Sequence, residues 1–188
     1  MKNDLFSIGP FTVHGYGLMI AIGVLSAYYM VEYRAKKKQM DWEKVFPLTV
    51  WSVLGGFLGS KILYLLTRLP DILANPALLG SSIKDGFVVY GGIIGGILTA
   101  WIYCKCTKWN FWKIFDIAMP AVAMAQGFGR IGCLLAGCCY GIELDPANPI
   151  GIVFHNSAYA PNDVALLPTQ IISSVLDFAN CFVLLALS

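Results

Sequence analysis

Residues 45–66 read VFPLTVWSVLGGFLGSKILYLL, and these 22 residues contain one charged side chain, Lys61. A membrane-spanning helix needs about 20 consecutive, predominantly apolar residues. In hydrocarbon every backbone polar group has to be paired within its own segment, which makes helix the default for such a run. This stretch therefore predicts a transmembrane helix.

Four other apolar runs of similar length occupy residues 15–33, 87–103, 111–135 and 166–188. The composition agrees, because 57% of the 188 residues are hydrophobic and 13% are charged, whereas a soluble domain is about 25% charged. We therefore expect an all-α, polytopic transmembrane helical bundle with at least five spans. We expect residues 1–188 to form a single integral membrane domain, with a structured outer-face loop at about 136–166.

Basic residues are concentrated in the loops that follow the first and third spans. Short cytoplasmic loops of membrane proteins are enriched in Lys and Arg, so these loops are expected to be cytoplasmic. The opposite side has three basic residues, Lys2, Arg68 and Lys84, against eight. The eight are Arg34, Lys36, Lys37, Lys38, Lys44, Lys105, Lys108 and Lys113. No basic patch with interleaved aromatic residues is present, so no nucleic-acid partner is expected.

Two basic residues, Arg130 and Lys61, lie well inside predicted spans, whereas Lys113 stands at the very start of one. A charge at membrane depth is costly unless it is paired or reaches water, so each is a candidate functional residue. Arg130 is flanked by Gly127, Gly129 and Gly132, which allow close backbone approach. A guanidinium can bind a phosphate through two parallel hydrogen bonds. The alternative is that either side chain extends to the lipid headgroups without any further role.

Two short motifs with aromatic and glycine residues open predicted spans on the expected outer side. The first is His14-Gly15-Tyr16-Gly17, and the second begins Tyr90-Gly91-Gly92. The tyrosines can contact a lipid headgroup, although interfacial tyrosine is also an ordinary feature of membrane proteins. The glycines can serve close helix packing instead of substrate binding.

Three cysteines, Cys133, Cys138 and Cys139, cluster near the end of the fourth span. Their spacing is not that of a zinc ribbon, and an adjacent pair is awkward for tetrahedral ligation, so neither a metal nor a cofactor is expected. Cys104 and Cys106 fall at the expected cytoplasmic face, away from these three. We expect the three to be structural, as small apolar residues or in a disulfide. A thiol-based membrane redox protein is the rival interpretation.

Several motifs occur in one order along almost the whole chain. They are Ile8-Gly9-Pro10, His14-Gly15-Tyr16-Gly17-Leu18, Gly59-Ser60-Lys61, Tyr90-Gly91-Gly92-Ile93-Ile94-Gly95, Gly129-Arg130-Ile131-Gly132 and Pro168-Thr169-Gln170. In this order the chain resembles the bacterial prolipoprotein diacylglyceryl transferase family, as a divergent or C-terminally truncated member.

The resemblance implies a multi-pass enzyme of the bacterial plasma membrane (the cell inner membrane) with its site near the outer leaflet. Such an enzyme moves a diacylglyceryl group from phosphatidylglycerol, a membrane lipid, to the lipobox cysteine of a preprolipoprotein signal peptide. The implied catalytic residues are Tyr90 and Arg130. The implied substrate-binding residues are His14, Tyr16, Lys61, Gly91, Gly92, Gly129 and Gln170.

The chain departs from the family pattern at three places. Tyr90 stands where the family usually has histidine, and tyrosine is a poorer proton acceptor at neutral pH. The segment after Arg130 contains cysteines instead of an Asn-rich stretch, and Ile171-Ile172-Ser173 replaces Leu-Tyr-Glu. A non-catalytic lipid-binding homologue is therefore the second rival interpretation.

Overall fold

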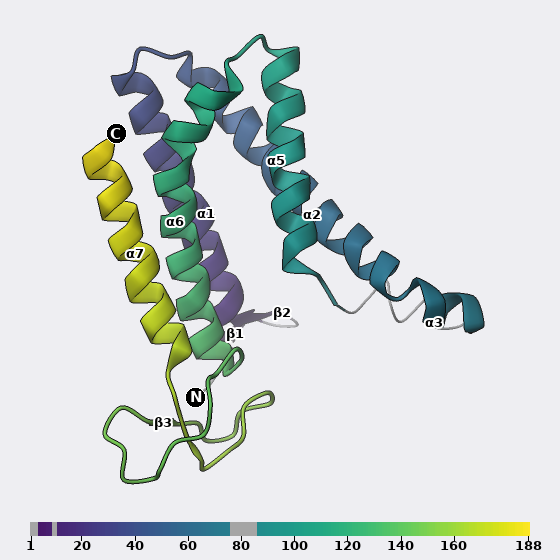
Figure 1. Cartoon of the computed structure of the whole chain (residues 1–188), viewed down its shortest axis with the longest axis vertical. Helices are drawn as coiled ribbons and strands as arrows, with labels where there is room; N and C mark the ends of the chain where they lie inside the picture. Colours follow the sequence, from purple (N-terminus) through teal and green to yellow (C-terminus); the bar gives the residue numbers. More distant parts are fainter. Residues whose placement is uncertain (1–3, 9–10, 76–85) are drawn as a thin grey trace. The chain divides into compact units, whose positions relative to one another are not determined.

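The computed structural model describes residues 4–8, 11–75 and 86–188. The elements in chain order are β1 (Asp4–Ile8), β2 (Phe11–His14), α1 (Gly15–Lys37), the 3-10 helix η1 (Trp42–Lys44), α2 (Val45–Thr67), α3 (Leu69–Ala74), α5 (Val89–Cys106), α6 (Phe111–Ala136), β3 (Ile152–Val153), β4 (Ala165–Leu166) and α7 (Thr169–Leu187) (Figure 1).

Five of these helices are long and apolar enough to cross a membrane: α1, α2 with η1, α5, α6 and α7. The prediction of an all-α polytopic bundle with at least five spans is therefore confirmed. The predicted bounds differ from the helix ends by a few residues. The third span, for example, was placed at 87–103, whereas α5 runs from Val89 to Cys106.

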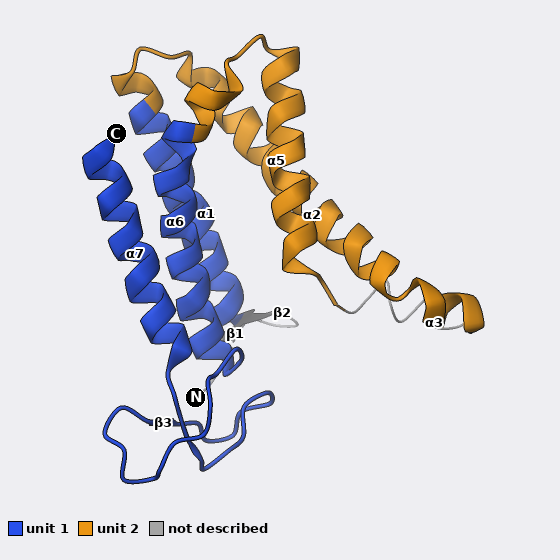
Figure 2. Ribbon diagram, viewed as in Figure 1, with its two compact units in different colours: residues 1–34, 116–188 blue, residues 35–115 orange. Residues whose placement is uncertain are grey.

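The chain divides into two compact units, which are coloured separately in Figure 2. Unit 1 comprises residues 1–34 and 116–188, and unit 2 comprises residues 35–115. Each unit has its own helix contacts, so each is described by itself. The expectation of a single membrane domain stays a prediction.

In unit 1, α6 packs between α1 and α7, which run antiparallel to it (Figure 1). A Cβ atom at Gly23 of α1 would lie 3.1 Å from the carbonyl oxygen of Ala125 on α6. On the other side, the hydroxyl of Ser174 on α7 donates a hydrogen bond of 3.0 Å to the carbonyl of Gly127. Small residues let helix backbones approach closely in lipid, where the hydrophobic effect does not drive helices together.

The loop between α6 and α7 is folded into a small cap. β3 pairs antiparallel with β4, and Glu143 and Asn162 add isolated bridges to this sheet. Phe154, Ala160 and Leu166 form a buried apolar cluster under it. Because the loop has its own ladder and its own apolar cluster, it forms an ordered layer at the end of unit 1.

In unit 2, α2 and α5 pack antiparallel through two facing Gly-x-x-x-Gly motifs. Gly55 and Gly59 of α2 lie against Gly95 and Gly91 of α5. A Cβ atom at Gly59 would lie 2.9 Å from the Cα atom of Gly95, which is closer than real Cβ atoms come. Only glycine at these positions allows the two backbones to touch.

The two basic loops of unit 2 meet at one end of this helix pair. The hydroxyl of Tyr103 donates to the carbonyl of Lys44 over 3.3 Å. The ammonium of Lys36 lies 4.0 Å from the ring centroid of Trp42, and that of Lys44 lies 5.8 Å from the centroid of Trp109. Tryptophan and lysine together are typical of a membrane interface. The assignment of this end to the cytoplasm stays a prediction.

Gly9 and Pro10, which belong to the first motif, lie outside the described residues. The same holds for Lys2 and Lys84, two of the three basic residues on the expected outer side.

The glycine contact predicts a difference between two neighbouring substitutions on α5. A Cβ atom at Gly95 would lie 3.0 Å from the Cα atom of Gly59, whereas one at Gly96 would lie 3.6 Å from the Ser52 carbonyl oxygen, an ordinary contact. Gly95→Ala should therefore lower the free energy of unfolding by about 1–3 kcal/mol through overpacking. Gly96→Ala, the matched control, should leave it unchanged or raise it. Denaturant unfolding in detergent micelles measures both, and equal stabilities would contradict the packing described.

Candidate active site

Arg130 lies on α6, partly exposed, in the part of unit 1 where α6 runs between α1 and α7. Next to it, a Cβ atom at Gly129 would meet no heavy atom of the described residues within 4 Å beyond its own helix and chain neighbours. The α6 surface at Gly129 is therefore open. A ligand group can approach the α6 backbone there, one residue from the guanidinium.

The other two glycines around Arg130 bring the neighbouring helices close. A Cβ atom at Gly132 would lie 3.1 Å from the ring of Tyr16 on α1, and one at Gly127 would lie 2.8 Å from the ring of Phe178 on α7. The Phe178 ring also stacks edge-on against Phe128, with centroids 5.3 Å apart. Packing therefore accounts for Gly127 and Gly132, whereas Gly129 keeps space open.

Asp177 on α7 is a membrane-depth carboxylate that the sequence argument did not single out. Arg130 lies close enough to interact with it electrostatically, and Gln126, one turn away on α6, is hydrogen-bonded to it. Its Oδ2 atom is buried and has no hydrogen-bond partner among the described residues. An acidic residue within an apolar run is a functional candidate by default. The position of Asp177 within the fifth predicted span could therefore have identified it from the sequence.

Tyr16 and His14 lie where β2 passes into α1. His14 ends β2 and pairs with Asp4 in the register of the hairpin, and its side chain is exposed. Tyr16 is 41% exposed, and its ring covers Gly132 two residues after Arg130. Tyr16 therefore lies at the same level along α6 as Arg130, but on another face, because residues two apart on a helix point about 200° apart.

Gln170 is fully buried in the first turn of α7. Its Nε2 atom donates a hydrogen bond of 2.8 Å to the carbonyl of Cys138, while its Oε1 atom has no partner among the described residues. The adjacent Thr169 hydroxyl donates to the carbonyl of Cys139 over 2.7 Å. In this structure the two side chains fasten the end of α6 to the start of α7, and a substrate contact by Gln170 stays a prediction.

In unit 2, Lys61 contacts the segment that leads into α5. Its ammonium donates to the carbonyl of Gly86 over 3.2 Å and lies 4.7 Å from the ring centroid of Phe87. Gly86 has φ +77°, and a Cβ atom there would collide with the ring of Tyr64. Lys61 and Tyr64 therefore hold the chain just before Tyr90.

Tyr90 stands in the first turn of α5 with 74% of its surface exposed, whereas Gly91 beside it is buried. Gly91 and Gly92 both face α2, Gly91 against Gly59 and Gly92 against Ser60. The packing alternative that the sequence left open therefore accounts for both glycines. A direct substrate contact by either of them stays a prediction.

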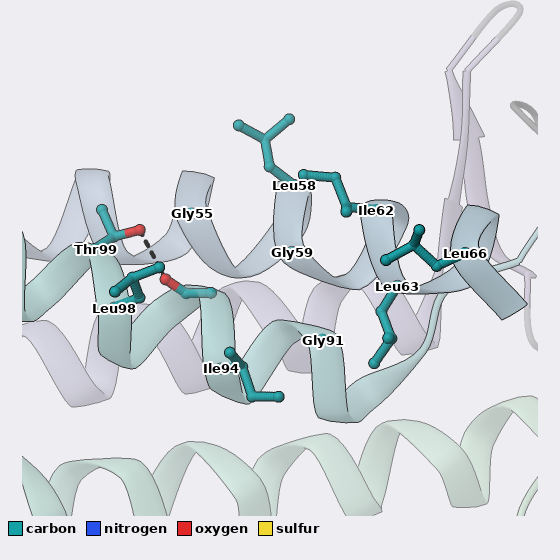
Figure 3. A pocket seen from close by; sticks show the side chains of 11 residues that line it. Gly55, Leu58, Gly59, Ile62, Leu63, Leu66, Gly91, Ile94, Leu98 and Thr99 are labelled. Atoms are coloured by element: carbon teal, nitrogen blue, oxygen red, sulfur yellow. Dashed lines mark hydrogen bonds between the residues drawn. The ribbon is translucent and has the colours of Figure 1, made fainter.

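An apolar groove of about 360 Å³ runs along the α2–α5 contact (Figure 3). Its walls include Leu58 and Ile62 from α2, and Ile94 and Leu98 from α5. The Thr99 hydroxyl donates to the carbonyl of Gly95 over 2.7 Å, so this polar group is satisfied within the helix. A groove with such walls suits a hydrocarbon chain better than a polar headgroup.

The residues predicted for the site thus fall into two sets. In unit 1, Arg130 and Gly129 are neighbours on α6, Tyr16 of α1 contacts α6 at Gly132, His14 lies directly before α1, and Gln170 lies at the start of α7. Unit 2 brings together Lys61, Tyr90, Gly91 and Gly92 at one end of the α2–α5 pair. Each unit thus contains one basic side chain and one tyrosine of the predicted site.

Five helices long and apolar enough to cross a membrane, some with a basic or acidic side chain within the span, are typical of a polytopic membrane protein. The model of the family described as "Prolipoprotein diacylglyceryl transferase" matches residues 3–188, and the chain belongs to this family.

Named relatives are similar over most of the chain. A phosphatidylglycerol–prolipoprotein diacylglyceryl transferase of Clostridium tetani is 45% identical over 98% of this chain and 73% of the relative. A second, from Clostridium perfringens, is 43% identical over 95% of this chain and 69% of the relative. One from Salmonella arizonae is 37% identical over 88% of this chain and 57% of the relative. Membership therefore extends across all five long helices.

Proposed function

We propose that this protein transfers a diacylglyceryl group from phosphatidylglycerol to the lipobox cysteine thiol of a preprolipoprotein. Membership in the family and the names of the relatives support this activity. The structural observation that carries it is the position of Arg130, a guanidinium at membrane depth beside the open surface at Gly129. A lipid phosphodiester is the ligand that such a group attracts from within a bilayer.

In the proposed reaction the substrate thiol attacks the carbon of the diacylglycerol moiety that bears the phosphate. A carbon–sulfur bond forms and the carbon–oxygen bond to phosphate breaks, with its electron pair staying on the phosphate oxygen. The thiol proton leaves to a base, and glycerol phosphate departs. Arg130 binds the phosphate and stabilises the negative charge that develops on it. The enzyme needs no nucleophile of its own, because the attacking thiol belongs to the substrate.

The remaining predicted residues are assigned supporting roles. Tyr90, exposed at the start of α5, is proposed to orient the headgroup or to take part in the proton transfer. Lys61 is proposed to supply a second positive charge at membrane depth. Tyr16 and His14 are proposed to contact the headgroup near the start of α1. The apolar groove between α2 and α5 is proposed to accept an acyl chain.

The finer localisation is also a proposal. We place the protein in the bacterial plasma membrane with the site near the outer leaflet and the basic ends of unit 2 in the cytoplasm. The excess of basic residues in those loops and their contacts with Trp42 and Trp109 support this orientation.

Arg130 should be the least replaceable side chain for transfer. Arg130→Ala removes a preorganised donor to the phosphate and should lower kcat by on the order of 10²–10³-fold. Arg130→Lys keeps the charge but loses the planar pair of donors, so it should also be impaired, though less. Transfer of radiolabelled lipid to a lipobox peptide measures both. Val122→Ala, at an exposed position about two turns earlier on the same helix, is the matched control for a change on α6. A wild-type rate for Arg130→Ala would contradict the proposed phosphate contact.

Asp177 should act through Arg130 as a positioning residue. Asp177→Asn should lower kcat/KM about tenfold, equivalent to about 1.4 kcal/mol of transition-state stabilisation. Because the two side chains would then act as one unit, adding Asp177→Asn to Arg130→Lys should cause little further loss. The same transfer assay with purified variants provides the double-mutant cycle. Fully additive losses would show that Asp177 does not act through Arg130.

The proposed orientation predicts which thiols an impermeant maleimide reaches in intact cells. In a Tyr159→Cys variant the introduced thiol, at a position 67% exposed in the cap loop, should be modified. Cys106, exposed at the end of α5, should react only after the membrane is permeabilised. Peptide mass spectrometry locates the label. Modification of Cys106 in intact cells without modification at position 159 would reverse the orientation.

A further inference from the structure

Three thiols converge where α6 ends, although their spacing in the sequence is not that of a known metal site. The Sγ atoms of Cys133, Cys138 and Cys139 all lie within 4.8 Å of one another. Cys133 and Cys138 are half-buried, and Cys139 is exposed. All three are free cysteines. The cluster plays no part in the proposed transfer, because that reaction takes its thiol from the substrate.

The turn after α6 brings the three thiols together. Gly137 has φ +72°, and the amide of Cys138 donates back to the carbonyl of Cys133 over 3.0 Å. Cys139 follows with φ +58°, a left-handed conformation that is uncommon for a residue with a side chain. The chain bends at Cys139, and the two adjacent thiols and that of Cys133 lie within 4.8 Å of one another despite the adjacent positions of Cys138 and Cys139.

The first turn of α7 holds this turn in place from outside. Gln170 donates to the carbonyl of Cys138 over 2.8 Å, and Thr169 donates to the carbonyl of Cys139 over 2.7 Å. Gln170 is completely buried, so its hydrogen bond is shielded from water. In metal sites, hydrogen bonds to the residues that carry the ligand atoms fix the orientation of those ligands.

We propose that Cys133, Cys138 and Cys139 bind one soft, thiophilic cation of the Zn²⁺ type through three thiolates. Zinc–sulfur bonds of about 2.3 Å place the sulfur atoms of a tetrahedral site about 3.8 Å apart, so the cluster needs little rearrangement. Thiolate ligands select zinc and other soft metals over magnesium or calcium. Three protein ligands leave one position of a tetrahedral site for water or an external ligand, and Cys139 is exposed to solvent.

The bound cation joins the last turn of α6 to the turn held by α7, three residues after Arg130. Its role is therefore to stabilise the helix end that presents Arg130, and not to carry out chemistry. Thiols bind such a cation as thiolates, so binding releases protons and the affinity for the cation should rise with pH.

The test is a Zn²⁺ titration of the purified full chain in detergent, with a non-chelating reductant and a chromogenic chelator as competitor. One equivalent should bind per chain, and the affinity should increase between pH 6 and pH 8, about tenfold per pH unit for each proton displaced. Replacing any one of the three cysteines by serine should weaken binding by at least about 10-fold to 100-fold. Cys106→Ser, an exposed cysteine outside the cluster, is the matched control and should bind as the wild type does.

A second measurement avoids substitution altogether. In the wild-type chain, saturating Zn²⁺ should protect Cys133, Cys138 and Cys139 from maleimide while Cys106 continues to react, with peptide mass spectrometry as the readout. Three results would overturn the proposal: no binding under reducing conditions, binding lost with Cys106 but kept without the cluster, or equal labelling of all thiols with and without Zn²⁺. Quantitative oxidation of two cluster thiols to a disulfide in the protein as isolated from cells would also overturn it.

Discussion

The structure depends on one constraint, which is that hydrocarbon offers no hydrogen-bond partner to a polar group. The five long helices satisfy their backbone groups internally, and their contacts come from close packing instead of exclusion of water. Glycine is therefore placed where backbones touch. Gly59 and Gly95 allow α2 to contact α5, and Gly132 allows Tyr16 of α1 to lie on α6.

The same constraint makes every charge at membrane depth informative. Lys61 lies against the Gly86 carbonyl and the Phe87 ring. Arg130 is accompanied by Asp177 on the neighbouring helix. An isolated charge would cost several kcal/mol in an apolar medium, so these partners are part of the explanation for each side chain's position.

Individual residues show how far sequence reasoning extends. Arg130 could be identified from the sequence alone, because a charged residue within an apolar run is unusual. The sequence allowed two interpretations of Gly91, helix packing and substrate binding. Only the contact with Gly59 on the facing helix showed that packing accounts for a glycine at this position. Asp177 carried the same signal as Arg130, but its relation to Arg130 depends on the register between α6 and α7. No sequence period reports that register, because Ser174 and Phe178 set it through contacts with Gly127.

The sequence by itself determined the five membrane helices and membership in the family, because apolar run length and motif order are properties of the linear chain. Only the tertiary structure decided that Cys133, Cys138 and Cys139 form one cluster. Their spacing argued against tetrahedral metal ligation, since it does not reveal the left-handed conformation at Cys139. The hydrogen bonds that support the turn come from Thr169 and Gln170, 30 or more residues further along the chain. Interactions at that separation exist only after α7 has packed against α6.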